Sequence, residues 1–323
     1  MMSSELLYLS TADVQQLNIS PRAAREAVIG AFRDNAARRN VSLPKSSIEI
    51  GPGHLFQSMS SASEVSGIAT VKWIGVVPLS EKHGAYEING LICASDYKTG
   101  HPVAVLDANL ITQIRTAAMS AAAAVYLAPE IPTALGLVGC GSQALSHLDA
   151  FVDLFPSIRK VYLLSRSNTS AENIAAVVLQ KGLEPVISSD PRTLLTHSEI
   201  VVSSVPRASD SKPFLDARLL PSSSFVSAVD AGWTWYPETF AAFNTLVTDC
   251  LEQSASPLDA SGRPVEFVRF RDDLGHVASD SSRVGSPMRC LFSFRGFAIA
   301  DLALADLVIR KARAVGIGKI LPR

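Results

Sequence analysis

The segment from Leu135 to Ala144, which reads LGLVGCGSQA, constrains the fold of this chain more than any other. Its apolar run ends at Gly139, and Gly139, Gly141 and Ala144 take the three positions of a G-x-G-x-x-G/A fingerprint. The first glycine permits a tight turn out of a strand, and the second lets the backbone approach a pyrophosphate. The small third residue lets a helix pack closely, with its N-terminal N–H groups facing the phosphates. The motif predicts a dinucleotide-binding turn.

The residues on both sides of the motif favour this interpretation over a plain turn. Thr133 to Val138 has the composition of a buried strand, and Gln143 to Phe155 carries apolar residues at helical spacing. Strands and helices then alternate. The expected strands are Val161–Ser165, Pro185–Ser188, Ile200–Val205, Phe225–Asp230 and Thr245–Asp249, and the expected helices lie at 170–180, 192–197 and 237–243. This alternation predicts a doubly wound parallel sheet of the Rossmann type.

The residues before the fingerprint follow a different pattern. Ser20 to Ala37 starts with a serine cap and a proline and has apolar residues at helical spacing, which predicts an amphipathic helix. Asp96 to Gly100 (DYKTG) has the composition of a hairpin turn leading into a strand at Pro102–Asp107. Four segments rich in β-branched and aromatic residues predict an antiparallel sheet: Ser46–Ile50, Leu55–Met59, Gly67–Val77 and Glu87–Ser95.

Two further helices complete the predicted element order. Thr112 is a good N-cap for an alanine-rich helix that continues to Leu127, which places Arg115 in the first turn. A long helical pattern from Phe294 to Ala314 is expected to fold back onto the first domain.

These elements predict an α/β protein with two domains, for which 323 residues are enough. We expect a Rossmann dinucleotide-binding domain at 116–293. We expect a second domain, an α+β sheet domain, at 1–115, completed by a C-terminal helix at 294–323.

The composition excludes several classes of function. Hydrophobic residues make up 47% of the chain and charged residues 18%, as in a globular protein. The formal net charge is -1 and there is no long run of lysine or arginine, so no nucleic-acid partner is expected. The longest apolar stretch, Ala117 to Ala128, is interrupted by Ser120 and is too short to span a bilayer, so no membrane partner is expected.

The cysteine and histidine patterns predict the cellular compartment of the protein and indicate that no metal is bound. The four cysteines, Cys93, Cys140, Cys250 and Cys290, form no C-x-x-C pair, and we expect free thiols in a reducing cytoplasm. The start, MMSSELLYLS, has no basic n-region and does not resemble a secretory signal. The six histidines have no metal-ligand spacing, so no metal is expected.

A series of motifs runs along the whole chain. In order they are VKWIGVVP, DYKTGHPVAVLD, LITQIRTAAMSAAAA, LVGCGSQA, SSVPRASDSKP, a strand ending in SAVD, and FRGFAIADLALADLV. Together they resemble the ornithine cyclodeaminase/mu-crystallin family, whose members include cyclodeaminases, amino-acid dehydrogenases, imine and ketimine reductases, and a hormone binder. The resemblance implies a homodimer in which the sheet domain pairs the subunits and forms the substrate site, beside a Rossmann domain that binds the cofactor.

The resemblance also implies roles for three basic residues. Arg115 matches an arginine that contacts the substrate carboxylate, for which a guanidinium offers two parallel hydrogen bonds; the alternative is a surface ion pair. Lys72, between Val71 and Trp73, becomes a ligand for the carboxylate or imino group; the alternative is an outward-facing strand residue. Lys45 falls where many members carry an arginine that touches the carboxylate, and lysine lacks the bidentate fork.

Asp230 is expected at the end of a strand, on the edge of the sheet where ligands bind. The family's catalytic aspartate aligns with it; a cap or turn aspartate is the alternative. The family segment G-x-D-x-P-G-K-x-E is replaced here by VDAGWTWYPE, so the lysine partner is absent. Trp233 and Trp235, which this departure brings in, either reshape the pocket or simply pack. Asp301 also matches a family position, with packing or a dimer contact as its expected role.

The end of the second Rossmann strand bears on the choice of cofactor. The sequence LLSRSNTS has no acid for a ribose 2′-OH, and Ser165, Arg166 and Ser167 suit a 2′-phosphate, so NADP(H) is favoured over NAD(H). The alternative is that Arg166 points to solvent. The expected cofactor-binding residues are Thr116, Gly139, Gly141, Ser142, Gln143, Ala144, Ser165, Arg166, Ser167, Ser203, Val205 and Val229.

These residues and the resemblance predict an NADPH-dependent reductase of a small α-imino acid, with hydride transfer to the C=N carbon. Arg115 and Lys72 are expected to hold the substrate carboxylate, while Asp230 stabilises the cationic imine and relays a proton. One alternative is an ornithine-type cyclodeaminase that releases ammonia with bound NAD. A second alternative is a non-catalytic, NADPH-dependent binder of a small ligand.

Overall fold

The computed structural model describes residues 5–51, 53–78, 86–207, 211–256, 262, 264–280 and 288–323. Residues 208–210 of the SSVPRASDSKP motif lie outside this described part. The chain divides into two compact units. Unit 1 comprises Met1–Met119 and Gly296–Arg323, and unit 2 comprises Ser120–Arg295. The first boundary lies inside a helix, α3 (Asn109–Leu127).

Unit 1 is built on an eight-stranded sheet in the order β16-β1-β7-β6-β5-β4-β2, with β3 paired to β4. Its strands are β1 (Glu5–Leu9), β2 (Asn40–Ser42), β3 (Ser46–Glu49), β4 (Leu55–Ser63), β5 (Ile68–Pro78), β6 (Tyr86–Asp96), β7 (Pro102–Asp107) and β16 (Lys319–Pro322). The ladders that join β2 to β7 are antiparallel, as predicted. The whole sheet is mixed, however, because β1 pairs in parallel with β7.

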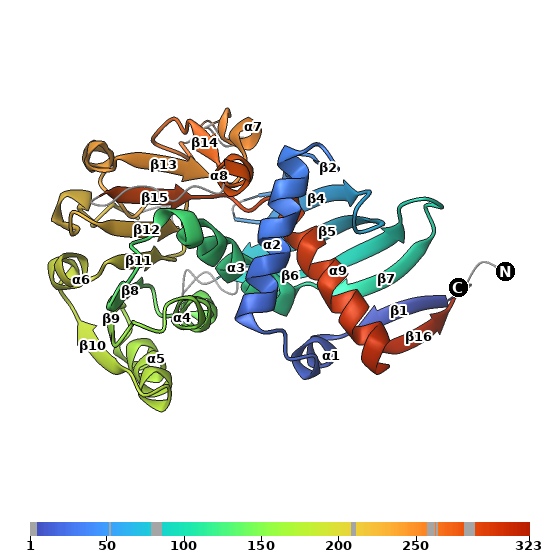
Figure 1. Cartoon of the computed structure of the whole chain (residues 1–323), viewed down its shortest axis with the longest axis horizontal. Helices are drawn as coiled ribbons and strands as arrows, with labels where there is room; N and C mark the ends of the chain where they lie inside the picture. Colours follow the sequence, from blue (N-terminus) through green and yellow to red (C-terminus); the bar gives the residue numbers. More distant parts are fainter. Residues whose placement is uncertain are drawn as a thin grey trace. The chain divides into compact units, whose positions relative to one another are not determined.

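Two helices pack side by side over one face of this sheet, α2 (Pro21–Ala36) and α9 (Ala298–Val315) (Figure 1). The start of α2 matches its prediction, because the Ser20 hydroxyl accepts the N–H of Ala23. The start of α9 was predicted too early, at Phe294. Gly296 has φ +90° and the next residue is extended, so the chain turns before the helix begins. A short helix, α1 (Thr11–Gln16), lies between β1 and α2.

Helix α3 starts before its predicted cap at Thr112. The carboxylate of Asp107 accepts the N–H of Asn109 at 2.9 Å, and an aspartate in that place caps a helix as well as a threonine does. Arg115 therefore lies inside the helix and not in its first turn, which corrects the prediction. By length and composition α3 can cross a membrane, but 72% of its apolar window is buried inside the protein, as in a core helix.

Unit 2 contains the predicted parallel sheet, in the order β10-β9-β8-β11-β12-β15-β13-β14. Its strands are β8 (Ala134–Val138), β9 (Lys160–Leu164), β10 (Glu184–Ser188), β11 (Ile200–Ser203), β12 (Ser224–Ala228), β13 (Thr245–Thr248), β14 (Asp272–Asp273) and β15 (Arg289–Ser293). The strand order reverses between β8 and β11. In doubly wound sheets, ligands bind at the carboxyl ends of the strands beside such a switch point.

Helices connect these strands as the alternation predicted. They are α4 (Ser142–Leu154), α5 (Asn168–Gln180), α6 (Pro191–His197), α7 (Leu251–Ser254), α8 (Leu274–Asp280) and the 3-10 turns η1 (Ala217–Leu219) and η2 (Pro237–Ala242). One strand is shorter than predicted. β12 ends at Ala228, because Ala231 and Gly232 have φ of 56° and 78° and turn the chain away from the sheet. Asp230 therefore lies in the turn beyond the strand.

Candidate active site

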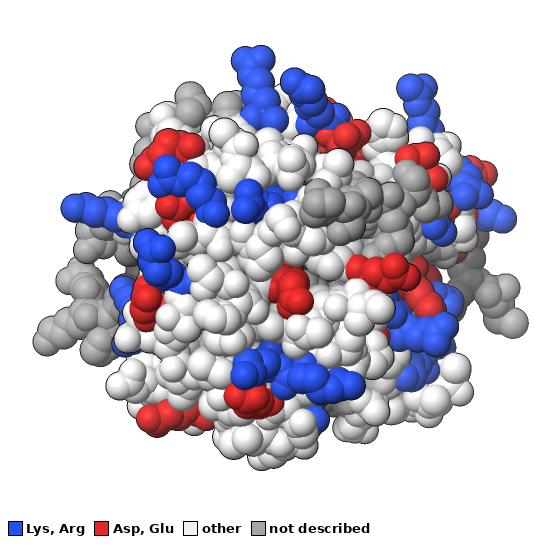
Figure 2. All heavy atoms as spheres, turned by 60° about the vertical axis from the view of Figure 1, so that its left-hand side comes forward, with Lys and Arg blue, Asp and Glu red and all other residues white. Residues whose placement is uncertain are grey.

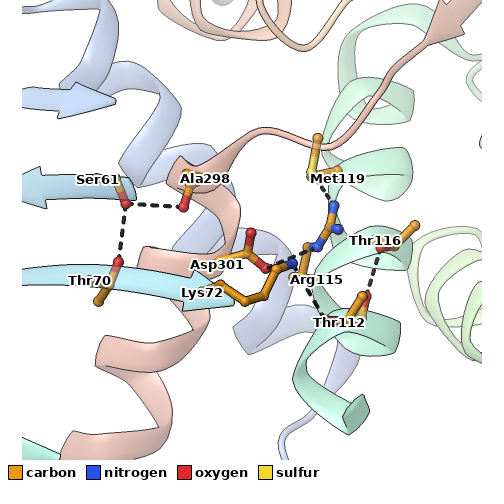
Figure 3. A network of polar contacts seen from close by, with 9 residues as sticks. All are labelled: Ser61, Thr70, Lys72, Thr112, Arg115, Thr116, Met119, Ala298 and Asp301. Carbon is orange, nitrogen blue, oxygen red and sulfur yellow. Dashed lines mark hydrogen bonds and ion pairs between the residues drawn. The ribbon is translucent and has the colours of Figure 1, made fainter. Parts of the chain in front are cut away.

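A buried ion pair joins a strand and the last helix of unit 1 (Figure 3). Lys72 on β5 donates from Nζ to Oδ1 of Asp301 on α9 at 2.7 Å, and its Nζ lies 3.5 Å from Oγ1 of Thr112. The side chains of Lys72 and Asp301 are 0% and 1% exposed. Val71 and Trp73, the neighbours of Lys72 along β5, are exposed. Lys72 is therefore on the inward face of the strand, which excludes the outward-facing alternative.

Arg115 on α3 contacts the same carboxylate. Its Nε lies 3.2 Å from Oδ1 of Asp301, and its Nη1 donates to the Met119 sulfur at 3.7 Å. A thioether is a weak acceptor, so this hydrogen bond uses little of the guanidinium's capacity. The side chain of Arg115 is only 8% exposed, so it is not a surface ion-pair residue.

Gly296 makes room for the Arg115 guanidinium. A Cβ atom at position 296 would lie 3.0 Å from Nη1 and 3.1 Å from Nη2, closer than side-chain contacts normally are. The backbone there has φ +90°, a conformation that residues with a Cβ rarely adopt. The glycine of the FRGF motif thus lets the chain pass directly beside the arginine.

Positive charge exceeds negative charge in this cluster. The pKa of Lys72 is lowered from 10.5 to about 8, first by burial and then by the charge of Arg115, while Asp301 opposes the shift. The charge of Lys45 lowers it further, so both of the other predicted substrate-binding cations act on Lys72. Asp301 is the carboxylate that contacts both Lys72 and Arg115, and its Oδ2 is buried without a hydrogen-bond partner in the described part of the chain. Such a cluster favours a bound carboxylate.

Asp301 is the residue whose role the sequence analysis missed. It was expected to serve packing or a dimer contact, and it is the shared counter-charge of Lys72 and Arg115. A carboxylate among buried alanines and leucines is expensive without a cation, and so is a lysine in the middle of a strand. The presence of both in one domain was the available signal, but their pairing joins residues 229 positions apart.

In unit 2, Asp230 is surrounded by neutral hydrogen-bond donors. Its Oδ1 accepts from the Ser203 hydroxyl at 3.0 Å and from the N–H of Gly232 at 3.1 Å. Its Oδ2 accepts from the Thr234 hydroxyl at 2.8 Å. Burial raises the pKa of Asp230 from 3.8 to about 6, against the lowering effect of these hydrogen bonds and of the Val205 N–H. A carboxyl group with this pKa can exchange a proton near neutral pH.

The two tryptophans pack, which decides between the alternatives left open by the sequence. Trp235 is fully buried in the core of unit 2, with its ring edge-on to Phe243 at 6.0 Å, and its Nε1 donates to the Ser203 hydroxyl at 3.1 Å. Trp233 is 7% exposed, and its Nε1 donates to the Val205 carbonyl at 2.9 Å. Both rings thereby fix the backbone and side chain beside Asp230.

The fingerprint turn has the geometry that the sequence predicted. Gly139 has φ +90°, and a Cβ there would lie 2.9 Å from the carbonyl oxygen of Ser204. Gly141 is the N-cap of α4 and has no side chain that could cap the first N–H groups of the helix. Ala144, in the first turn of α4, is fully buried. Oε1 of Gln143 is buried without a hydrogen-bond partner among the described residues.

The remaining predicted cofactor residues lie in several places. Ser142 is the first residue of α4, Ser203 ends β11, and Val205 and Val229 follow the ends of β11 and β12 at the same edge of the sheet. Thr116 differs, because it belongs to unit 1 and its hydroxyl donates to the Thr112 carbonyl within α3.

The turn after β9 places one basic side chain in solvent. Ser167 is the N-cap of α5, where its hydroxyl accepts the N–H of Ser170, and the Ser165 hydroxyl accepts the N–H of Ser167. Arg166 between them is exposed. The two serines thus shape the turn, and Arg166 is accessible to a ligand.

The structure therefore gathers the predicted residues in two groups. Lys45, Lys72 and Arg115 belong to unit 1, where the first and last affect the pKa of Lys72, and Asp230 and the fingerprint belong to unit 2. Within the described ranges, no cluster of three or more His, Cys, Asp or Glu side chains has the arrangement of a metal site.

Comparison with known proteins gives one consistent result. The family model described as "Ornithine cyclodeaminase/mu-crystallin family" matches residues 5–238. The alanine dehydrogenase of Archaeoglobus fulgidus is 26% identical over 323 residues, which cover 97% of each chain. A Delta(1)-pyrroline-2-carboxylate reductase of Bacillus cereus is 25% identical over 307 residues, 89% of this chain and 91% of the relative. Among solved structures, an archaeal alanine dehydrogenase dimer with bound NAD has a TM-score of 0.85 at 25% identity, covering 98% of this chain and 99% of its own.

Proposed function

Because the chain belongs to the ornithine cyclodeaminase/mu-crystallin family, we propose that it is an NAD(P)H-dependent oxidoreductase that reduces the C=N bond of a small α-imino acid. The similar proteins include an alanine dehydrogenase and a Delta(1)-pyrroline-2-carboxylate reductase. Alanine and pyrroline-2-carboxylate both have a carboxylate next to a carbon atom that is bonded to nitrogen. The reduction converts that C=N carbon into the α-carbon of an amino acid.

One observation carries the proposal, namely the buried Lys72–Asp301–Arg115 cluster with its excess of positive charge. Arg115 presents a guanidinium that its protein partners only partly satisfy, and Lys72 lies beside it. A substrate carboxylate bound there neutralises the excess and accepts charge-assisted hydrogen bonds. Lys45 adds attraction at longer range. The cluster thus selects substrates by their carboxylate and orients the adjacent C=N bond.

Asp230 is the proton-handling group in this proposal. A reduced nicotinamide supplies the hydride when it is bound. The reacting imine becomes cationic when protonated, and a carboxylate stabilises that charge. The three neutral donors around Asp230 hold the carboxylate in place without neutralising it.

The residues of the fingerprint fit a dinucleotide. The close approach of Gly139 to Ser204 leaves no room for a side chain, and the N-terminus of α4 has no side-chain cap. We propose that the N–H groups of Ser142 and Gln143 bind the pyrophosphate. We further propose NADPH as the preferred form, because Arg166 is exposed at the end of β9 and no acidic residue stands in the LLSRSNTS turn.

The protein partner that we propose is a second copy of this chain. The face of the unit 1 sheet that points away from α2 and α9 carries a patch of Trp73, Leu91 and Val71, which are 46%, 45% and 39% exposed, and Phe56 stacks on Trp73 at 5.9 Å. Trp73 and Leu91 are direct partners across β5 and β6. An apolar sheet face of this kind is typical of a subunit interface. The archaeal alanine dehydrogenase of the same fold is a dimer.

Nucleic acid and membrane are not part of the proposal. Basic and acidic side chains are interspersed with uncharged ones on the face shown in Figure 2, in keeping with the net charge of -1. A reducing compartment such as the cytoplasm suits an enzyme that draws on NADPH and whose cysteines Cys93, Cys140, Cys250 and Cys290 are free thiols.

The test is NADPH consumption with a panel of cyclic imine carboxylates, and of 2-oxo acids with ammonia or methylamine, run beside NADH. We expect turnover on one of these classes with NADPH preferred. Arg166→Ala should raise KM for NADPH at least tenfold and leave KM for NADH within about twofold, since the lost contact is to the 2′-phosphate. Ammonia release from ornithine or lysine with NAD, without net cofactor consumption, would make the protein a cyclodeaminase. Cofactor binding without turnover on any of these substrates would make it a binder.

A further inference from the structure

We propose that Thr234 is a positioning residue that assigns the proton of the Asp230 carboxyl group to Oδ2. The inference rests on the proposed function, in which Asp230 handles a proton. Reduction of a neutral imine requires one hydride and one proton, and the proton on Oδ2 is the one that we assign to the substrate nitrogen. Its departure leaves Asp230 as a carboxylate.

The first step of the argument concerns Oδ1. The indole N–H of Trp235 can only donate, and it donates to the Ser203 hydroxyl oxygen at 3.1 Å. The single hydroxyl hydrogen of Ser203 is left for Oδ1 of Asp230, which also accepts the N–H of Gly232. Oδ1 therefore accepts the N–H of Gly232, which can only donate, and the hydroxyl of Ser203, whose orientation the Trp235 N–H restricts. A proton on Oδ1 would weaken both of these hydrogen bonds, so the neutral carboxyl group carries its proton on Oδ2.

The second step concerns Oδ2. Oδ2 accepts the hydrogen bond of the Thr234 hydroxyl at 2.8 Å. Thr234 is fully buried, so its hydroxyl has no access to bulk water. A hydroxyl can donate to a carboxylate and, after rotation, accept from a carboxyl O–H. Thr234 can therefore satisfy Oδ2 in both protonation states, whereas an ammonium in its place could satisfy only the charged one.

The groups with the largest effect on the pKa of Asp230 are uncharged. β11 contributes Ser203, the turn after β12 contributes Gly232 and Thr234, and the N–H of Val205 adds a weaker effect. The largest contributions to the shift of its pKa come from burial and from these neutral hydrogen-bond donors. Burial raises the pKa of Asp230, and of the groups that lower it the Thr234 hydroxyl has the largest effect. Removing that hydroxyl should raise the pKa further.

The experiment measures the pKa of Asp230 without relying on catalysis. The free energy of unfolding of the wild-type protein and of Asp230→Asn is measured by urea denaturation from pH 4 to pH 9. Because folding raises the pKa of Asp230, the stability of the wild type relative to Asp230→Asn falls as the pH rises and becomes constant above the folded-state pKa, which the end of this fall therefore gives. The same pair is then measured in the Thr234→Val background, which keeps the shape of the side chain. The matched control is Thr234→Ser, which keeps the hydroxyl.

We expect Thr234→Val to raise this pKa by about one pH unit and Thr234→Ser to leave it within about 0.3 units. An unchanged pKa in Thr234→Val overturns the inference, and so does an equal rise in Thr234→Ser. If Thr234→Val does not fold, Thr234→Ala serves as the variant without a hydroxyl. In active enzyme, the acidic group seen in the pH profile of kcat/KM should move with the pKa measured by unfolding. A pKa shift in a protein that reduces no imine would contradict the proposed function and leave the Thr234 assignment standing.

Discussion

At the scale of single residues, the properties of the site come from placing charges where water does not reach them. Asp301 holds two cations with one carboxylate, and Gly296 lets the second cation lie against the backbone. Each side chain alone would be costly to bury. Together they leave an excess positive charge that the carboxylate of the proposed substrate would neutralise, so the proposed binding site is formed before a substrate binds.

A pH dependence follows from the position of Lys72. Burial and the neighbouring guanidinium lower its pKa to about 8, so Lys72 loses its charge as the pH rises through about 8. We predict that kcat/KM for a carboxylate substrate falls about tenfold per pH unit above this value. Lys72→Met should lose about 100-fold in kcat/KM at pH 7 and should not show this basic limb. Lys319→Met, at an exposed lysine of β16, serves as the control. A basic limb that persists in Lys72→Met would assign it to another group.

At the scale of elements, a buried histidine joins three segments of unit 2. Ser227 on β12 donates to the Ser120 hydroxyl at 2.7 Å, which in turn lies 2.9 Å from Nε2 of His147 on α4. Nδ1 of His147 lies 2.7 Å from the Gln143 carbonyl. One neutral tautomer satisfies the whole chain, with Nδ1–H donating and Nε2 accepting. The network ties α4, which begins at the fingerprint turn, to the central sheet.

This network makes the protein sensitive to acid. Burial lowers the pKa of His147 from 6.5 to about 4, so the unfolded chain takes up this proton first as the pH falls. Stability from His147 is present above pH 6.5 and is lost between pH 6.5 and pH 4, by up to ~3 kcal/mol. Urea denaturation should show this loss in the wild-type protein relative to His147→Gln, whose side chain does not titrate. Parallel pH profiles for wild type and His147→Gln would contradict the prediction.

The elements also show what the sequence can predict. Local signals were sufficient where one segment carries the whole motif, as at Ser20 for the start of α2, at Asp96 for its hairpin turn and at Gly139 for the fingerprint. Competing local signals caused the errors at Thr112 and Phe294, where Asp107 supplies a better-placed cap and Gly296 turns the chain.

Pairings between distant segments were beyond local signals. β1 pairs with β16, which is far from it in the sequence, and the residue pattern of neither segment indicates which strand it pairs with. Asp301 meets Lys72 across most of the sequence for the same reason. The packing roles of Trp233 and Trp235 depend on the carbonyl and hydroxyl groups that they reach, which belong to β11 and the residues after it.

At the scale of the whole molecule, the proposed dimer requires the apolar sheet face of unit 1. Trp73→Arg puts a charge in the centre of that face and removes the ring that stacks on Phe56. We predict that light scattering coupled to gel filtration gives a dimer for the wild type and a monomer for Trp73→Arg at micromolar concentration, because a buried unpaired charge opposes association. Val315→Arg, at an exposed position near the end of α9, is the control and should remain dimeric. A wild-type monomer would refute the proposed partner.

The most direct test of the central claim compares two cyclic imines that differ only in their carboxylate, 1-pyrroline-2-carboxylate and 1-pyrroline, in wild type and in Arg115→Met. If the Lys72–Asp301–Arg115 cluster binds the substrate carboxylate, the wild type should prefer the carboxylate by ~1,000-fold in kcat/KM. Arg115→Met should reduce that preference by ~100-fold and leave turnover of 1-pyrroline nearly unchanged, since a charge-assisted bidentate contact is lost. Arg313→Met, at an exposed arginine of α9, should keep the wild-type preference. An undiminished preference in Arg115→Met would show that the carboxylate binds elsewhere and would contradict the account.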